Sequence, residues 1–207
     1  MPMITIAISK GRVARQAIKS LAKCGYEFAE DIKTTRKLIL ESNNHKLQII
    51  LMKGQDIPVY VDAGVVDMGI VGKDILDESD CDVYEILSLN IGKCKLAVAG
   101  YENFDFKSKN FLKIATKYPR MTEHYFASLG IPHEIVALNG SVELAPLIGL
   151  SDVIVDIVET GTTLRENNLV VLENIHDISS KVIVNKVHFK TKYTKIKPII
   201  NSLEANL

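Results

Sequence analysis

Acidic, hydroxyl-bearing and glycine residues gather in one short segment of the chain, residues 156–163, with the sequence DIVETGTT. Gly161 would let the backbone approach an anion, and threonine hydroxyls and backbone N–H groups would donate hydrogen bonds to it. Asp156 lies within an apolar run, where an unpaired carboxylate costs roughly several kcal/mol. An aspartate can also be kept at such a place to cap a loop. The combination of acid, glycine and threonine favours a phosphate site over that structural alternative.

The neighbouring segments supply elements that would position this loop. Residues 153–158 form a short run rich in β-branched residues, typical of a strand buried on both faces. Leu164, Arg165 and Glu166 are compatible with the start of a helix. Strand, loop and helix together would form a phosphate cradle, because the helix dipole favours negative charge at its N-terminus.

A second acidic candidate lies upstream, in the segment NGSVELAP, residues 139–146. The Asn-Gly pair indicates a turn, and Ser141 is the predicted N-cap of a helix that Pro146 keeps short or kinked. Glu143 would lie in the first turn of that helix, where the dipole favours a negative charge. Helix capping and substrate contact both remain open for Glu143.

Lysine and glycine recur where predicted strands end. Residues 3–8 predict a strand, followed by Ser9-Lys10-Gly11-Arg12 and an amphipathic helix over 13–24. This second candidate anion site has a plain alternative, since basic residues after a strand are usually solvated. Lys53 follows a predicted strand over 47–52, and Gly72-Lys73 follows one over 65–71, which contains Asp67. For Asp67 a structural role is favoured over catalysis.

Composition excludes several classes of protein. The chain has 207 residues and a formal net charge of +0, which argues against a mainly electrostatic nucleic-acid binder. Its three cysteines form no CxxC pair, so a disulfide framework or a zinc site is not expected. No signal peptide and no apolar stretch of membrane-spanning length, about 18 residues, is seen. We therefore expect a cytoplasmic protein that engages neither nucleic acid nor membrane.

The order of predicted elements indicates an α/β protein with mainly parallel sheets. Strands are predicted at 36–41, 83–89, 95–100, 169–172 and 182–184, with a helix over 119–129 and a terminal helix over 187–203 broken near Pro198. Two crossings, around 90–95 and 170–180, divide the chain into two lobes. We expect lobe I to comprise 1–90 plus 175–207, and lobe II, with the 156–163 loop, to comprise 91–174.

The segment 139–169, NGSVELAPLIGLSDVIVDIVETGTTLRENNL, closely resembles the signature of the ATP phosphoribosyltransferases. The resemblance extends to ISKGR near the start, DIPVYVDAGVVDMGIVGKD in the middle and KYPRMTEHYF before the signature, and so covers nearly the whole chain. It implies a two-lobed fold like that of type II periplasmic binding proteins, with the site in the inter-lobe cleft. It also implies a glycosyltransferase of histidine biosynthesis that joins ATP to phosphoribosyl pyrophosphate and releases pyrophosphate.

The resemblance also assigns roles to residues. Asp156, Glu143 and Lys10 would be catalytic. The loop 160–163 would hold the 5′-phosphate, Asp156 and Glu159 would contact ribose hydroxyls or order the loop, and the cations would hold the pyrophosphate or the ATP phosphates. The substrate-binding set is Lys10, Gly11, Arg12, Arg36, Lys53, Gly72, Lys73, Asp156, Glu159, Thr160, Gly161, Thr162, Thr163 and Leu164.

The resemblance further implies Mg²⁺ carried by the pyrophosphate rather than by protein ligands. The chain looks like the short form of the family, which works with a regulatory subunit resembling a histidyl-tRNA synthetase. Two alternatives stay open. One is a solute-binding module with the same two lobes, against which the missing export signal counts. The other is a different phosphoribosyltransferase, although most of those place two adjacent acids in their motif, whereas Asp156 and Glu159 are separated here.

Overall fold

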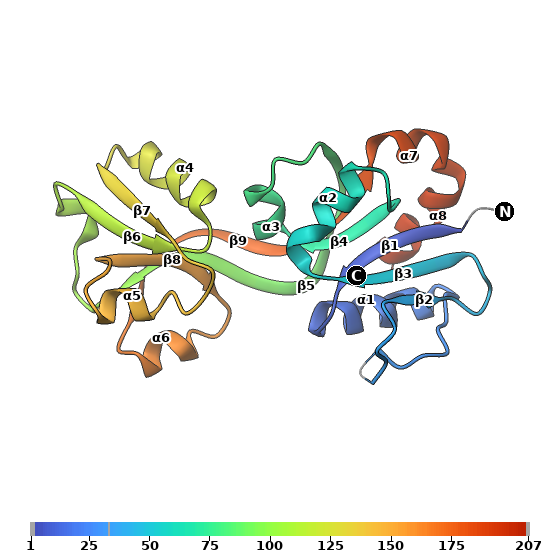
Figure 1. Cartoon of the computed structure of the whole chain (residues 1–207), viewed down its shortest axis with the longest axis horizontal. Helices are drawn as coiled ribbons and strands as arrows, with labels where there is room; N and C mark the ends of the chain where they lie inside the picture. Colours follow the sequence, from blue (N-terminus) through green and yellow to red (C-terminus); the bar gives the residue numbers. More distant parts are fainter. Residues whose placement is uncertain (1–2, 33, 206–207) are drawn as a thin grey trace. The chain divides into compact units, whose positions relative to one another are not determined.

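The structure is a computed structural model that describes residues 3–32 and 34–205 (Figure 1). The chain divides into two compact units. Unit 1 comprises Met1–Gly92 and Ser179–Leu207, and unit 2 comprises Lys93–Ile178. The chain crosses between them in two long strands, β5 (Val83–Gly100) and β9 (Val170–Asn185).

Parallel strands form the centre of unit 1. Its strands follow the order β2-β3-β1-β4-β9, and β1 pairs in parallel with both β3 and β4. The carboxyl ends of these three strands therefore lie at one edge. The elements are β1 (Ile4–Ser9), α1 (Arg12–Lys23), β2 (Ile39–Glu41), β3 (Leu47–Met52), η1 (Gly54–Asp56), α2 (Ile57–Asp62), β4 (Met68–Gly72), α3 (Lys73–Glu78), α7 (Lys186–Thr191) and α8 (Tyr193–Glu204).

The sheet of unit 1 is apolar on both faces because each face carries helices. Ile4, Ile6 and Ile8 pack with residues of α1 and α8, whereas Ala7 packs with α2. This alternation is the period of two expected of a strand. Burial on both faces explains why these strands are near-continuous apolar runs.

Unit 2 repeats the plan with the order β5-β8-β6-β7, in which β6 pairs in parallel with β7 and β8. Figure 1 shows α4 on one face of this sheet, with α5 and α6 on the other. Phe126 of α4 accordingly joins one core cluster, while Ala145 of α5 and Leu164 of α6 join another. The elements are η2 (Phe106–Ser108), β6 (Leu112–Thr116), α4 (Pro119–Leu129), β7 (His133–Ala137), α5 (Leu144–Leu147), β8 (Val153–Val158) and α6 (Thr162–Glu166).

Several predicted boundaries are wrong. The separate strands over 83–89 and 95–100 are one strand, β5, and those over 169–172 and 182–184 are parts of β9, which begins at Val170. Strand β5 continues through Gly92 although that residue has φ +65°, and it pairs with the neighbouring strands β9 and β8. The strand expected over 36–41 begins only at Ile39.

The end of the chain also differs from the prediction. The terminal helix breaks at Lys192, between α7 and α8, whereas Pro198 lies inside α8. Asn185 starts α7, because its Oδ1 accepts hydrogen bonds from the N–H groups of Val187 and His188 at 3.0 and 2.9 Å. No helix within residues 3–32 and 34–205 is long and apolar enough to cross a membrane.

Candidate phosphate-binding site

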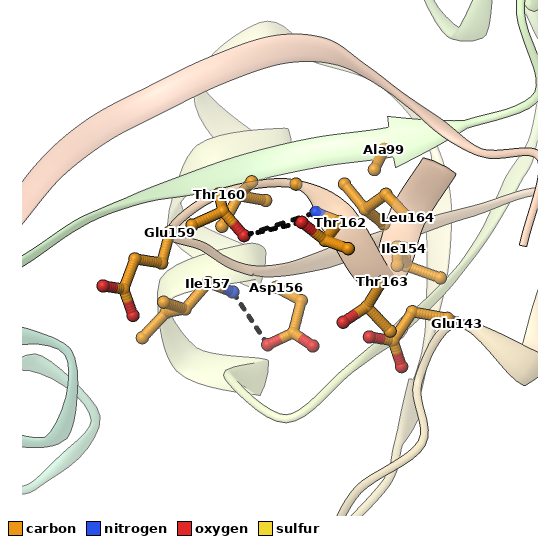
Figure 2. Close-up of a pocket in the computed structure, with 12 residues that line it drawn as sticks. Ala99, Glu143, Ile154, Asp156, Ile157, Glu159, Thr160, Thr162, Thr163 and Leu164 are labelled. Carbon is orange, nitrogen blue, oxygen red and sulfur yellow. Dashed lines mark hydrogen bonds between the residues drawn. The ribbon is translucent and has the colours of Figure 1, made fainter. Parts of the chain in front are cut away.

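A pocket of about 250 Å³ in unit 2 opens at the carboxyl end of β8 (Figure 2). It brings together the Thr-Gly-Thr-Thr loop, the β8 aspartate and the glutamate that precedes α5. Its lining residues are Ala99, Glu143, Ile154, Asp156, Ile157, Val158, Glu159, Thr160, Gly161, Thr162, Thr163 and Leu164. The carboxyl ends of strands are the usual place for ligands in α/β sheets.

Packing beneath the loop fixes its position over β8. Leu164, only 6% exposed, anchors α6 in the same apolar cluster as Ile154 and Ala145. Ala99 of β5 lies opposite Ile154 in the ladder, and its small side chain leaves room for the pocket. The loop is therefore tied to the sheet by a buried leucine just after its last threonine.

Hydrogen bonds within the loop set its shape. Gly161 has φ +69°, a conformation that side chains disfavour. The Oγ1 atoms of Thr160 and Thr162 lie 3.1 Å apart. The guanidinium of Arg165 donates to the Thr160 carbonyl at 3.1 Å and to Thr162 Oγ1 at 3.2 Å. Helix α6 has only 5 residues, so its dipole contributes little here. Threonine hydroxyls and loop N–H groups are therefore the main donors available to an anion.

The contact made by Arg165 was not predicted from the sequence, which marked this residue only as helix-compatible. The spacing could have suggested it, since residues three apart in a helix share a face, as Thr162 and Arg165 do. Asn167 provides a second unpredicted brace, because its Nδ2 donates to the Thr163 carbonyl at 2.9 Å.

Three carboxylates line the same pocket. Asp156 is half-buried, and its Oδ1 accepts a hydrogen bond from the N–H of Ile157 at 2.7 Å. Figure 2 shows the side chains of Asp156, Glu143 and Thr163 close together, while the Glu159 carboxylate points away from them. Glu143 occupies the N-cap position of α5 and makes no side-chain capping hydrogen bond. The predicted N-cap, Ser141, is wrong, and Glu143 does not lie in the first turn.

The charge of this pocket has a chemical consequence. No lysine or arginine is among its lining residues, so the nearby Arg165 guanidinium is the cation that braces the loop. Carboxylates repel a phosphate but accept hydrogen bonds from sugar hydroxyls and supply oxygen ligands to a hard cation. The arrangement suits a phosphorylated sugar, with its phosphate at the threonines and its hydroxyls toward Asp156.

The predicted basic residues belong to unit 1. Lys10 follows β1, Lys53 follows β3 and Lys73 follows β4, so all three lie at the carboxyl edge of parallel strands. Lys10 and Lys53 are exposed. Gly11 has φ +122°, a conformation that side chains disfavour, whereas a Cβ at Gly72 would lie 2.1 Å from the Asp74 carboxylate and would require that side chain to move.

Lys73 differs from the other two because carboxylates already hold it. Its Nζ lies 2.7 Å from Asp77 and 2.9 Å from Glu85, and Glu85 also pairs with Lys181. Partial burial opposes the charge, but the hydrogen bonds to Asp77 and Glu85 prevail and raise the pKa of Lys73. Arg36 is exposed in the loop before β2, and the side chain of Arg12 lies outside the described part of the structure.

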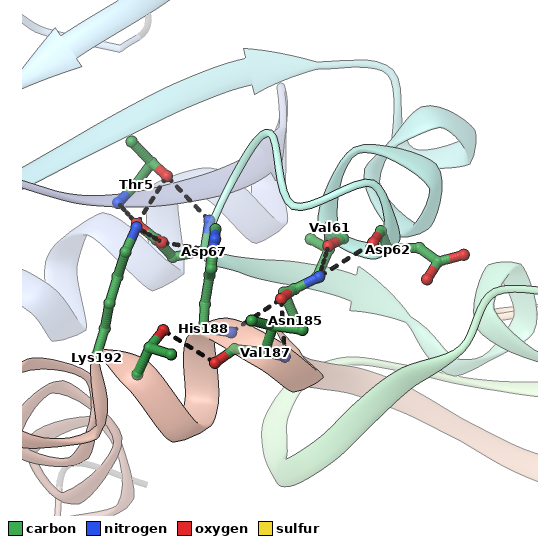
Figure 3. Close-up of polar contacts among 9 residues, drawn as sticks. Thr5, Val61, Asp62, Asp67, Asn185, Val187, His188 and Lys192 are labelled. Atoms are coloured by element: carbon green, nitrogen blue, oxygen red, sulfur yellow. Dashed lines mark hydrogen bonds and ion pairs between the residues drawn. The ribbon is translucent and has the colours of Figure 1, made fainter.

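Asp67 takes part in a buried polar network at the opposite edge of unit 1 (Figure 3). Its side chain is only 2% exposed, and its Oδ2 accepts hydrogen bonds from Thr5 N and Oγ1 at 2.8 and 3.0 Å. Its Oδ1 lies 2.5 Å from Lys192 Nζ and 2.7 Å from His188 Nδ1. These contacts tie β1 and β4 to the junction of α7 and α8, as expected of a structural aspartate.

Fold and pocket together define a class: a two-unit α/β protein with a small-molecule site where a sheet strand ends. A sequence model described as ATP phosphoribosyltransferase matches residues 53–205. The ATP phosphoribosyltransferase of Oceanobacillus iheyensis is 51% identical over 205 residues, which span 99% of each chain. That of Brachyspira hyodysenteriae is 47% identical, over 99% of this chain and 100% of its own. The chain belongs to the ATP phosphoribosyltransferase family, whose reaction is the first step of histidine biosynthesis.

A solved structure agrees with this assignment. A chain of the ATP phosphoribosyl transferase (HisG:HisZ) complex from Thermotoga maritima matches with a TM-score of 0.85 and 34% sequence identity. The match covers 99% of this chain and 98% of that one. The predicted α/β, two-lobed fold is confirmed.

Proposed function

We propose that this chain condenses ATP with 5-phosphoribosyl 1-pyrophosphate to N1-(5-phosphoribosyl)-ATP and pyrophosphate, using the unit 2 pocket to hold the phosphoribosyl group. The observation that carries the proposal is the meeting of a threonine-glycine loop with Asp156 and Glu143 in one pocket. The family supplies the reaction, and the pocket supplies donors and acceptors that fit a sugar phosphate.

Positioning and charge stabilisation would do most of the catalysis. Adenine N1 is unprotonated at neutral pH, so the attack needs no strong base, but N1 is a weak nucleophile and pyrophosphate is a polyanionic leaving group. The loop 160–163 would hold the 5′-phosphate by hydroxyl and backbone N–H donors. Asp156 and Glu143 would face the ribose ring, whose anomeric carbon gains positive charge as pyrophosphate departs. Glu159 would order the loop.

The cations of unit 1 would take the remaining phosphates. Lys10 and Lys53 are exposed at the strand edge, so either can reach a flexible polyphosphate. Arg12 and Arg36 are further candidates. Lys73 would have to give up its contacts with Asp77 and Glu85 to bind phosphate oxygens, so it would contribute less than Lys10 or Lys53 to phosphate binding.

A metal ion completes the proposal. Enzymes of this family use a metal ion in catalysis. Among the residues that the structure describes, no group of three or more His, Cys, Asp and Glu side chains is arranged to hold one. We infer that the ion is Mg²⁺ carried by the phosphate oxygens of the substrate rather than by protein ligands. Such an ion would neutralise the charge of the departing pyrophosphate.

A regulatory subunit is part of the proposal. The matching Thermotoga maritima structure is a HisG:HisZ complex, and the match spans nearly the whole of both chains. We propose that this chain also works in the cytoplasm with a subunit that resembles a histidyl-tRNA synthetase.

Identification of the product tests the reaction. The chain is incubated with ATP, phosphoribosyl pyrophosphate and MgCl₂, alone and with the regulatory subunit, and the product is analysed by NMR. We expect a new ribosyl linkage at adenine N1, with pyrophosphate formed in equal amount. Absence of this linkage under both conditions, or transfer to another base in place of ATP, would contradict the proposal.

A further inference from the structure

A second cavity, of about 330 Å³, lies in unit 1 at the amino ends of β1 and β3. Lys10 and Lys53 lie at the carboxyl ends of the same strands, so this cavity is at the other edge of the sheet. Its volume falls in the range of small-molecule sites, about 300–1,000 Å³. The lining residues are Ile4, Tyr26, His45, Lys46, Thr194, Lys195, Pro198 and Ile199.

The floor of this cavity is apolar and firmly held. Ile4 is 2% exposed and Ile199 is 1% exposed, and both belong to the main core cluster of unit 1. Tyr26 packs against the same cluster. Because Ile4 and Ile199 expose almost no surface, an apolar body of a ligand would contact mainly the half-buried Tyr26 and the exposed Pro198. Tyr26 is already held by the core, which keeps the ordering cost of binding low.

The rim carries a cation on a rigid turn. No carboxylate in the described part of the chain pairs with the ammonium group of Lys46, although carboxylates pair with several other lysines. The backbone of Lys46 is fixed, because its N–H donates to Asn44 Oδ1 at 3.1 Å and its carbonyl accepts from Ile4 N at 3.1 Å. Its charge is thus available to an anionic group at the rim.

A hydrogen-bond acceptor arises from a break in the backbone ladder of α8. Pro198 has no N–H, so the carbonyl of Thr194, four residues earlier in the helix, lacks its usual partner there. Both residues line the cavity. Burial, with Cys24 as a smaller contribution, raises the pKa of Tyr26, which keeps its hydroxyl protonated. The wall therefore adds polar groups to an apolar floor and a cationic rim.

We propose that this cavity binds a small organic acid with an aromatic or branched apolar body, its carboxylate at Lys46 and its body on Tyr26 and Pro198. The site is separate from the phosphoribosyl pocket of unit 2 and does not rest on the proposed reaction. It shares β1 with the Ser9–Gly11 loop, so a ligand here contacts the strand that carries Lys10.

The probe for this site is 2-naphthoate, titrated into the ¹⁵N-labelled full chain and followed by NMR. We expect saturable shifts of the amide signals of residues 45–47 and 194–199, and weaker binding of the neutral 2-naphthylmethanol and of the cationic 2-naphthylmethylamine. Lys46→Gln should weaken 2-naphthoate binding about fivefold, the size of one exposed charge pair. Lys19→Gln, at an exposed lysine of α1 outside the cavity, is the matched control.

A second variant distinguishes loss of ligand binding from loss of folding. Thr194→Phe places a ring at an exposed wall position and should abolish the shifts while the spectrum stays that of a folded protein. The proposal fails if 2-naphthoate shifts no signals around the cavity. The proposal also fails if the shifts caused by 2-naphthoate map to the loop after β8. It fails as well if the Lys46→Gln variant binds 2-naphthoate as tightly as the Lys19→Gln control does.

Discussion

Gly161 shows how one residue shapes the unit 2 pocket that we propose for the phosphoribosyl group. Its φ of +69° turns the chain so that Thr160 and Thr162 face each other, and Arg165 then braces both. A Cβ at this position would lie 3.3 Å from Arg165 Nη1, closer than usual van der Waals contact. The loop is ordered by its own hydrogen bonds before any ligand binds, which lowers the entropy lost on binding.

Substitutions in the loop should weaken binding of phosphoribosyl pyrophosphate. Thr163→Val removes one donor, and Gly161→Val adds a side chain where φ is +69°. A lost charge-assisted hydrogen bond costs roughly 1.5–3 kcal/mol, so we expect affinity to fall about tenfold or more in each. Calorimetry measures this directly. Thr191→Val, at an exposed threonine of α7, is the control, and unchanged affinity in both loop variants would refute the assignment.

Asp156→Asn separates a catalytic from a structural role. The side chain is half-buried and lines the pocket, so we expect turnover to fall at least tenfold while the melting temperature changes by only a few degrees. Turnover number and melting temperature are measured on the same preparation. A large loss of stability with normal turnover per folded molecule would show that Asp156 serves the fold.

Contiguous residues were the most predictable part of the site. Asp156 and the threonines share one strand end, so their meeting in one pocket follows from local sequence. The sequence did not predict that Glu143 occupies the N-cap position of α5. The backbone of Ser141 adopts φ +49°, and the helix begins after Glu143 rather than after Ser141. The bracing by Arg165 depends on a side-chain conformation that sequence does not encode locally.

At the scale of elements, Asp67 joins parts of the chain that are far apart in sequence. It connects the starts of β1 and β4 with the junction of α7 and α8 through Thr5, His188 and Lys192 (Figure 3). The side chain of Lys192 reaches back to a buried carboxylate, and the chain turns there while α8 continues through Pro198.

Removing the charge of Asp67 should destabilise unit 1. Breaking a buried ion pair typically costs about 3–5 kcal/mol, because one charge is left without its partner. We expect Asp67→Asn to lower the free energy of unfolding by about this amount, seen as a lower urea midpoint. The affinity for phosphoribosyl pyrophosphate should stay unchanged. Glu134→Gln, in an exposed pair with Lys113, should leave the midpoint where it is. Equal midpoints in the two variants would contradict a stabilising role for the network.

Helices with clear end signals were predicted well, and long strands were not. The helix 119–129 has the bounds that its proline and Gly130 indicate, and Gly130 is left-handed at φ +68°. The segments of β5 and β9 were each predicted as two strands beside a crossing, whereas each is one continuous strand paired with its neighbours. Such pairing is a tertiary effect, which a local pattern cannot reveal.

At the scale of the whole molecule, the resemblance of the sequence motifs and the structural match lead to the same family. The Thermotoga maritima chain matches over 98% of its length and belongs to a complex with a second kind of subunit. If this chain works in the same way, control by the end product resides in the partner.

We therefore expect histidine to inhibit the complex but not the isolated chain. The anion-binding donors of the unit 2 pocket are the ones proposed to hold the sugar phosphate, so histidine would bind there only in competition with phosphoribosyl pyrophosphate. In the complex, the coupling is expected to be about 1–3 kcal/mol and reciprocal, so that substrates lower the affinity for histidine. Titration of histidine into each preparation checks this, and micromolar binding to the chain alone would contradict it.

The most direct test of the central claim is the release of pyrophosphate from phosphoribosyl pyrophosphate, measured with and without ATP. The account predicts release that requires ATP, equals the amount of phosphoribosyl-ATP formed, and falls at least tenfold in Gly161→Val but not in Thr191→Val. Release at the same rate without ATP, or an unchanged rate in Gly161→Val, would contradict the assignment of the unit 2 loop as the phosphoribosyl site of an ATP phosphoribosyltransferase.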